Sequence, residues 1–180
     1  MNLLGISGSV RSASTSTALL RALAANATAD ISMRVFARVD ALPIFNPDNE
    51  AHDVPEPVAA FCNQIRRADG LIVATPEYVR TLPGGLKNAI DWLVSRDEII
   101  HKPVAIAHAS HRGDEMLDAL GRVLGTVSDR FEAGVFLRIP IASVEPANVP
   151  DVLHRADTRH AMRAFLDRFL ETISQNQTAP

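Results

Sequence analysis

The chain has 180 residues, of which 47% are hydrophobic and 22% are charged, and its formal net charge is −3 at pH 7. This length fits one globular domain, with a core large enough to fold without a disulfide or a metal ion. The slightly acidic balance argues against a nucleic-acid-binding protein, because such proteins usually carry a basic excess.

Short apolar runs bounded by turn-forming residues predict five strands, at residues 3–6, 33–36, 71–74, 103–107 and 134–139. Apolar residues at helical spacing predict one helix that starts near residue 15 and four more that include residues 58–67, 86–94, 117–127 and 162–173. The alternation predicts an α/β fold with a doubly wound parallel sheet, because right-handed crossovers place helices on both faces. In such sheets, ligands bind beyond the carboxyl ends of the strands.

The segments outside these elements also carry information. Residues 40–57 contain four prolines, too many for a helix, and long loops in compact domains tend to be functional. Residues 175–180 form a polar tail, so we expect a single domain over residues 1–174. No apolar run approaches the roughly 18 residues of a membrane span. With one cysteine and no apolar leader at its start, the chain is expected to be cytoplasmic.

A run rich in serine and threonine follows the first predicted strand, at residues 5–17, and it contains two glycines and one arginine. Backbone amides in a glycine-containing turn and at a helix N-terminus attract anions, and hydroxyl groups add further donors. Arg11 would add a charge-assisted hydrogen bond. The run therefore predicts an anion site, and the alternative is a helix-capping cluster with exposed serines.

Other sites known at such a loop need residues that are missing from this sequence. A nucleophile elbow requires G-x-S-x-G, whereas the run G-I-S-G-S at residues 5–9 lacks the last glycine. A P-loop requires a lysine, and none precedes Lys87. Cys62 falls in the second predicted helix, where a small buried thiol is a better interpretation than a phosphatase nucleophile.

The most specific string follows the third strand and reads T-P-E-Y-V-R-T-L-P-G-G-L-K-N-A-I-D-W-L from Thr75 to Leu93. Together with S-V-R at residues 9–11, Ser14, and L-P-I-F-N-P-D at residues 42–48, it resembles the NADPH-dependent FMN reductase family. Members of this flavodoxin-like family include quinone, azo-dye and chromate reductases. The resemblance covers residues 5 to about 95, and it implies a flavodoxin-like FMN-binding domain with strand order 2-1-3-4-5.

The resemblance also implies which residues bind FMN. The first loop matches the positions around the FMN phosphate with Ser9, Arg11, Ser14, Ser16 and Thr17. The string after the third strand matches the segment along the isoalloxazine ring with Pro76, Glu77, Tyr78, Val79 and Thr81. Three positions depart from the family pattern. Ser16 and Val79 stand where the family usually has asparagine, and Thr81 stands for serine, so Val79 removes a side-chain hydrogen bond.

The loop after the fourth strand is polar and contains Ser110 and Arg112. In the family this loop approaches the pyrimidine end of the flavin, where a positive or N–H group stabilises the charge of the reduced ring. The alternative is a solvated polar turn. His108 and His111 are expected on opposite faces of a strand end, and we predict no metal site.

By resemblance, the protein is expected to be an oxidoreductase in which NADPH or NADH reduces FMN. The reduced FMN then reduces quinones, azo compounds, free flavin or metal oxyanions such as chromate, in a ping-pong reaction. We expect no catalytic side chain, because flavin N5 carries the chemistry. The alternatives are a flavodoxin-type electron carrier, which is usually far more acidic than this chain, and a flavin-free interaction module.

We expect a homodimer, or a homotetramer built as a dimer of dimers, that acts on small molecules and not on nucleic acid or membranes. Apolar side chains in two loops predict an exposed patch that a symmetric dimer would bury. They are Ile44, Phe45, Tyr78, Val79 and Leu82. The resemblance to the NADPH-dependent FMN reductase family points the same way, because subunits in that family pair through the helix that begins near the position of Pro83.

Overall fold

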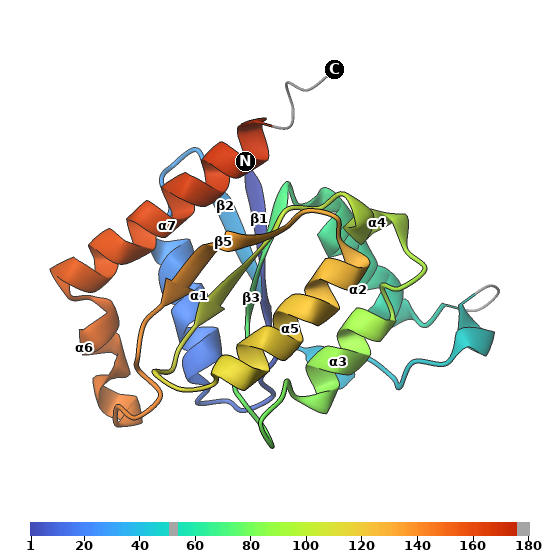
Figure 1. Ribbon diagram of the computed structural model, residues 1–180, viewed down its shortest axis with the longest axis horizontal. Coiled ribbons are helices and arrows are strands. Elements are labelled where there is room, and N and C mark those ends of the chain that lie inside the picture. Colours follow the sequence, from blue (N-terminus) through green and yellow to red (C-terminus); the bar gives the residue numbers. More distant parts are fainter. Residues whose placement is uncertain (51–53, 176–180) are drawn as a thin grey trace.

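A parallel sheet of five strands forms the centre of the computed structural model, which describes residues 1–50 and 54–175 (Figure 1). The strands are β1 (Asn2–Ser7), β2 (Ser32–Phe36), β3 (Gly70–Ala74), β4 (Val104–His108) and β5 (Phe131–Arg138). Their order in the sheet is β2-β1-β3-β4-β5, and all neighbouring strands are parallel. The predicted flavodoxin-like sheet with strand order 2-1-3-4-5 is therefore confirmed.

Helices cover both faces of the sheet (Figure 1). On one face, α1 (Thr15–Asn26), α6 (Val149–Leu153) and α7 (Ala156–Gln175) share a core with Leu3 of β1. On the other face, α2 (Glu56–Arg67), α3 (Gly84–Asp91), α4 (Asp97–Ile100) and α5 (Asp114–Val127) share a core with Leu4. Successive side chains of a strand point to opposite faces, so β1 contributes to both cores. Within the described residues, none of the helices combines the length and apolarity needed to cross a membrane.

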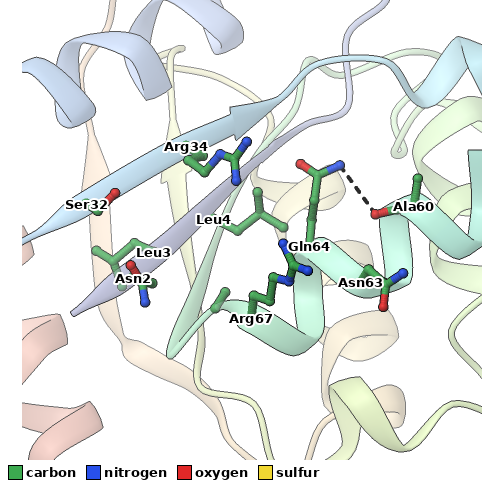
Figure 2. A pocket seen from close by; sticks show the side chains of 10 residues that line it. Asn2, Leu3, Leu4, Ser32, Arg34, Ala60, Asn63, Gln64 and Arg67 are labelled. Atoms are coloured by element: carbon green, nitrogen blue, oxygen red, sulfur yellow. Dashed lines mark hydrogen bonds between the residues drawn. The ribbon is translucent and has the colours of Figure 1, made fainter.

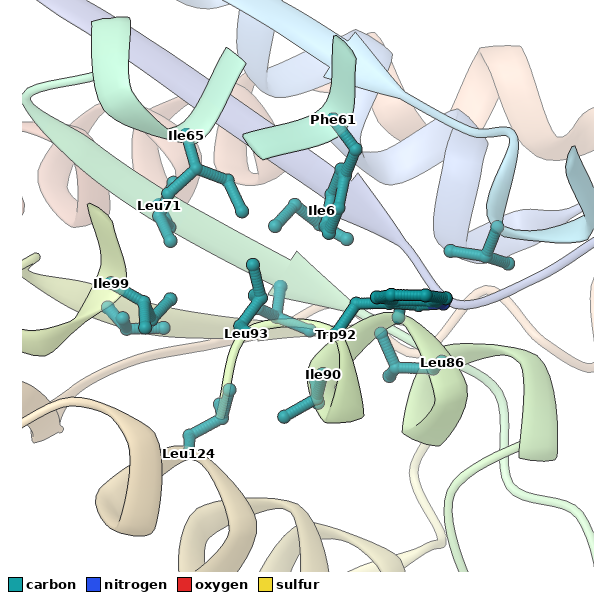
Figure 3. Close-up of a cluster of buried hydrophobic side chains, with 14 of the residues drawn as sticks. Ile6, Phe61, Ile65, Leu71, Leu86, Ile90, Trp92, Leu93, Ile99 and Leu124 are labelled. Atoms are coloured by element: carbon teal, nitrogen blue, oxygen red, sulfur yellow. The ribbon is translucent and has the colours of Figure 1, made fainter. Parts of the chain in front are cut away.

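The core on the α2 side contains Trp92, the bulkiest fully buried side chain among the described residues (Figure 3). Phe61 from α2 and Trp92 just after α3 are 1% and 0% exposed. Buried aromatic side chains of this size contribute strongly to core stability. Cys62 lies in the same core, and burial raises the pKa of its thiol. Its predicted role as a buried packing residue is confirmed, and Trp92 likewise serves packing.

The proline-rich segment is fastened to the end of α3. The Asn88 side chain accepts a hydrogen bond from the Phe45 amide at 2.8 Å and donates one to the Pro43 carbonyl at 2.9 Å. The Trp92 indole donates to the same carbonyl at 2.8 Å, and its ring meets Phe45 edge to face. This leaves Ile44 as the apolar side chain that points outward, 88% exposed. Two motifs that are separate in the sequence therefore form one structural unit.

The predicted elements differ from the observed ones mainly at their ends. The helical spacing predicts Val94 on the apolar face of the third helix, but Val94 lies beyond α3 and is 61% exposed. The reason is local: the amides of Leu93 and Val94 bond three residues back, to Ile90 and Asp91, so the turn tightens and Val94 rotates away from the core. Helices α4 and α6 were not predicted, because they have only four and five residues.

Two predicted segments, the proline-rich loop and the polar tail, include residues that the structure does not describe. The long loop is interrupted by the short 3-10 helices Val39–Ala41 and Pro47–Asn49, and its residues 51–53 lie outside the described residues. Helix α7 includes Gln175, the first residue of the expected polar tail. The remaining tail residues, 176–180, also lie outside the described residues.

Candidate functional site

The loops that follow β1, β3 and β4 meet around a cavity of about 480 Å³. This is the position where a doubly wound sheet binds its ligand. The loop after β5 closes the cavity on one side, and the Ala109 carbonyl fastens that loop by accepting from the amides of Ile141 and Ala142. The lining residues of the four loops are Arg11, Ala13, Thr15, Ser16, Thr75, Pro76, Glu77, His108, Ala109, Ser110, His111, Arg112, Ala142, Ser143, Val144 and Pro146.

Two larger hollows exist elsewhere, of about 650 and 700 Å³. Size alone therefore does not identify the site. The cavity at the carboxyl ends of the strands is distinguished by its polar lining, which combines hydroxyl groups, the guanidinium groups of Arg11 and Arg112, the Glu77 carboxylate and a buried histidine. We take it as the candidate functional site for that reason.

Several hydroxyl groups of the first loop bond to each other or to backbone amides. Thr17 and Ser7 share a hydrogen bond of 2.7 Å between their hydroxyl groups. The Ser14 hydroxyl caps α1 by accepting from the Thr17 amide at 3.2 Å, and the Ser9 hydroxyl accepts from the Arg11 amide at 3.3 Å. All four of these hydroxyl-bearing residues are buried. They shape the loop around the start of α1, and the capping alternative therefore describes Ser14 correctly.

Arg11 and Ser16 are the two predicted residues of this loop whose positions line the cavity. Ser16 lies in the first turn of α1, where backbone N–H groups have no carbonyl partner within the helix. Arg11 is exposed at the mouth. The first loop thus offers the cavity a guanidinium, a hydroxyl and the positive end of a helix, which together favour an anion.

Gly8 allows the loop after β1 to touch the loop after β3. Its amide donates to the Ala74 carbonyl at 2.9 Å, which extends the β1–β3 pairing beyond the end of β1. A Cβ atom at Gly8 would lie 2.3 Å from the Thr75 hydroxyl oxygen, closer than any side chain tolerates. A residue other than glycine would push the two loops apart and widen the base of the cavity.

The loop after β3 divides into two parts. Pro76 and Glu77 line the cavity, whereas Tyr78, Val79 and Thr81 line the neighbouring groove of about 700 Å³ between this loop, α3 and α5. The predicted flavin-binding residues of this string are therefore not all in one cavity of a single chain. Leu82, expected to be exposed, is buried in the core at 9% exposure, so that prediction was wrong.

The outer part of the loop after β3 is a tight turn. Tyr78 and Thr81 bond to each other through both their amides and carbonyls, at 2.9 and 3.1 Å. The two residues between them, Val79 and Arg80, have φ values of 52° and 61°. Positive φ at both central residues is the pattern of a type I′ turn, which asparagine tolerates and a β-branched residue does not. Val79 is thus strained, and its side chain is 95% exposed.

The loop after β4 is held by a histidine that the sequence did not single out as a site residue. His108 is 2% exposed, and its Nε2 lies 2.6 Å from the Arg112 carbonyl. Because a carbonyl only accepts, Nε2 carries the proton. Burial lowers the pKa of this imidazole, so the ring is neutral at pH 7. Its Nδ1 has no hydrogen-bond partner among the described residues. The signal in the sequence was a polar residue ending a fully apolar strand.

Gly113 completes this arrangement at the start of α5. It has a φ of 100°, which favours glycine, and a Cβ atom there would lie 3.1 Å from His108 Nε2 and 3.3 Å from a Glu77 carboxylate oxygen. Arg138 at the end of β5 donates to the Asp114 carboxylate and to the His111 carbonyl. The Arg138 guanidinium lowers the pKa of Asp114. These contacts fix Ser110 and Arg112, the predicted residues of this loop, at the rim of the cavity.

Comparison with known proteins adds the family context. A family model described as NADPH-dependent FMN reductase matches residues 1–135. A 2-hydroxy-1,4-benzoquinone reductase of Burkholderia is 46% identical over 85 residues, which are 47% of this chain and 45% of that protein. An NAD(P)H-dependent FMN reductase of Pseudomonas aeruginosa is 37% identical over 158 residues, covering 85% of this chain and 77% of the relative.

The fold also has a close match among solved structures. A flavoenzyme NAD(P)H:(acceptor) oxidoreductase from Paracoccus denitrificans superposes with a TM-score of 0.77 over 97% of each chain, at 24% sequence identity. At that identity, the match supports the fold and not the details of the site.

The strained turn generates a prediction about stability. Replacing Val79 by asparagine should raise the free energy of unfolding by about 1 kcal/mol, because asparagine adopts positive φ with less strain than a β-branched residue. Val79→Ala is the matched control, since it removes the branched side chain without the asparagine preference. Urea denaturation of the three proteins tests this. An asparagine variant no more stable than the wild-type protein would show that Val79 stores no such strain, and an alanine variant as stable as the asparagine variant would assign the strain to the β-branch alone.

Proposed function

Because this chain belongs to the NADPH-dependent FMN reductase family, we propose that it is an enzyme that passes electrons from NADPH or NADH through FMN to quinones. Azo compounds, free flavin and metal oxyanions such as chromate are further acceptors within this proposal. The relatives named as quinone reductases support the choice of quinones. Membership of a reductase family favours an enzyme over an electron carrier or a flavin-free interaction module. We also propose a cytoplasmic location, in line with the single buried cysteine.

The observation that carries the proposal is the cavity where the β1, β3 and β4 loops meet. Three of its features fit FMN. The start of α1 with Arg11 and Ser16 suits a phosphate. Gly8 lets the loops approach closely enough to form a narrow base. The lining also includes a buried neutral histidine, His108, whose Nδ1 has no hydrogen-bond partner among the described residues. The volume of about 480 Å³ lies in the usual range for small-molecule sites.

Each loop has a separate task in this proposal. Arg11, Ser16 and the first-turn amides of α1 hold the phosphate, while Ser9, Ser14 and Thr17 keep the loop in shape. Pro76 and Glu77 lie along the ring, and Ser110 and Arg112 face its polar edge. A cation at that edge stabilises negative charge on the ring. FMN, when bound, supplies the hydride chemistry, so the side chains bind, orient and polarise without forming covalent intermediates.

A kinetic test of the function uses the purified protein alone. It should show the visible absorbance of bound flavin and should oxidise NADPH when 1,4-benzoquinone is added, with no other reductase present. Double-reciprocal plots at several quinone concentrations should be parallel, because nucleotide and acceptor use the same open cavity in turn. If the protein purifies without flavin and stays inactive after FMN is added, the proposed enzyme function is excluded. Intersecting double-reciprocal lines, together with a demonstrated ternary complex, would exclude the ping-pong order.

Arg11 provides a direct test of the cofactor site. Replacing it by alanine should weaken FMN binding by about 1.5–3 kcal/mol, the scale of a charge-assisted hydrogen bond. Arg21→Ala is the control, because Arg21 is an exposed arginine on α1, the helix that follows the Arg11 loop, and does not line the cavity. Fluorescence titration of apoprotein with FMN measures both affinities. Equal affinities in the two variants would remove Arg11 from the site.

We propose a homodimer, with a tetramer as its dimer of dimers, in which a second copy covers the groove beside the cavity. Ile44, Tyr78 and Val79 are 88%, 43% and 95% exposed, and Tyr78 and Val79 line that groove. A two-fold axis would bury this patch on both copies. Tyr78, Val79 and Thr81 would then complete a flavin site shared between subunits.

Light scattering with FMN present should give about twice the chain mass of 19.5 kDa. Ile44→Glu should shift the protein toward the single-chain mass, because a carboxylate in an apolar interface is costly to bury. Ile100→Glu, the same substitution at an exposed isoleucine at the end of α4, is the control. A wild-type protein of single-chain mass with full activity would contradict the dimer and the shared site together.

A further inference from the structure

One of the two larger hollows lies near the amino ends of β1 and β2, whereas the candidate site lies at the carboxyl ends of the strands. This hollow has a volume of about 650 Å³ and opens between β2, the edge strand of the sheet, and helix α2 (Figure 2). It includes the first residues of β1 and β2, whereas the candidate site follows the last residues of β1, β3 and β4. The two cavities share no lining residue. The second is lined by Asn2, Leu3, Leu4, Ser32, Arg34, Ala60, Asn63, Gln64, Arg67 and Ala68.

The groove exists because α2 does not cover the edge of the sheet. Leu4 pairs with Arg34 in the β1–β2 register, so the two side chains lie next to each other on the α2 face. Leu4 is buried beneath the helix, at 2% exposure, while Ser32 and Arg34 remain exposed. The result is a groove with an apolar floor and a polar wall on each side.

Two guanidinium groups face this floor from opposite walls. Figure 2 shows Arg34 from β2 and Arg67 from α2 extending toward the space beside Gln64, above Leu4. Neither has a carboxylate partner within the described part of the chain. The neighbouring arginines differ: Arg66 is paired with Glu98, and Arg38 is paired with Asp40.

The groove also contains hydrogen-bonding groups that a ligand could share. Gln64 uses its amide N–H group on the Ala60 carbonyl, at 3.5 Å, and the other side-chain amides of the wall come from Asn2 and Asn63. The Asp69 carboxylate, two residues after Arg67, accepts a hydrogen bond from the backbone amide of Asn2 at 2.7 Å and is not among the residues that line the groove. Among the described residues, the lining thus combines cationic, uncharged polar and apolar side chains and includes no acidic one.

We propose that this groove is a second binding site, for a small organic phosphate whose phosphate group lies between Arg34 and Arg67. Two guanidinium groups on opposite walls match a dianion better than the single charge of a carboxylate, and each can bind phosphate oxygens through two N–H groups. The apolar part of the ligand lies over the buried Leu4 and against the exposed Ala60 of α2. The site is independent of the flavin cavity and of its reaction.

The probe is 1-naphthyl phosphate, titrated by calorimetry into protein already saturated with FMN, so that the flavin cavity is filled. One saturable site is expected, and 1-naphthol and inorganic phosphate, which each carry half of the recognised chemistry, should bind at least tenfold more weakly. The double variant Arg34→Gln with Arg67→Gln should lose at least tenfold in affinity for 1-naphthyl phosphate. The matched control is Arg38→Gln with Arg66→Gln, which removes the same charge from paired arginines nearby and should leave the affinity unchanged.

Amide NMR shifts locate the bound probe. They should move at Asn63, Gln64 and Ala68 and stay fixed at Ser16 and Ser110. If the double variant is unfolded by circular dichroism, Arg67→Gln alone is compared with Arg66→Gln, since both side chains are exposed on α2. Absence of saturable binding, equal losses in both pairs of variants, or shifts confined to the flavin cavity would each overturn the second site.

Discussion

The close approach of two loops at Gly8 is the constraint on which the candidate site depends. The parallel pairing of β1 with β3 continues past the strands, through the Gly8 amide and the Ala74 carbonyl. From this point the chain leaves toward α1 on one face and toward α3 on the other, and that divergence opens the crevice at the end of the sheet. A side chain at Gly8 would meet Thr75 at 2.3 Å, so the crevice keeps its narrow base only with glycine.

The polar residues around this crevice do two kinds of work. Ser7, Ser9, Ser14 and Thr17 bond to each other or to the loop backbone, which holds the start of α1 in place. On the opposite wall, His108 does the same for the β4 loop through the Arg112 carbonyl. Burial keeps that imidazole neutral, so the loop is fastened without a buried charge, which would be costly there. The groups left to meet a ligand are mainly backbone amides and the side chains at the rim.

Sequence patterns predicted the five-stranded parallel sheet and the positions of the three loops correctly, because apolar strands and helix periodicity constrain the backbone directly, and the family resemblance supplied the strand order. They failed where a side chain's environment depends on tertiary contacts. Leu82 reads as an exposed loop residue but turns into the core, and Val94 reads as helical but follows a tightened turn. His108 was passed over because a strand pattern does not reveal which residue meets a carbonyl four positions ahead. Pro76 and Glu77 line one cavity, whereas Tyr78, Val79 and Thr81 line another. This separation depends on a tight turn whose two central residues, V-R, are atypical for a turn with positive φ.

The departures from the family pattern at Ser16 and Val79 can be understood by separating what the backbone contributes at each position from what the side chain contributes. At Ser16 the position contributes a helix-terminal amide as well as a hydroxyl, and the amide does not depend on the side chain. At Val79 the usual asparagine suits a backbone with positive φ, and here the two bonds between Tyr78 and Thr81 hold the turn despite the valine. The Arg80 ion pair with Glu115 adds a further tie from the turn to α5. A site built largely from backbone geometry tolerates such side-chain changes, whereas it does not tolerate a Cβ at Gly8.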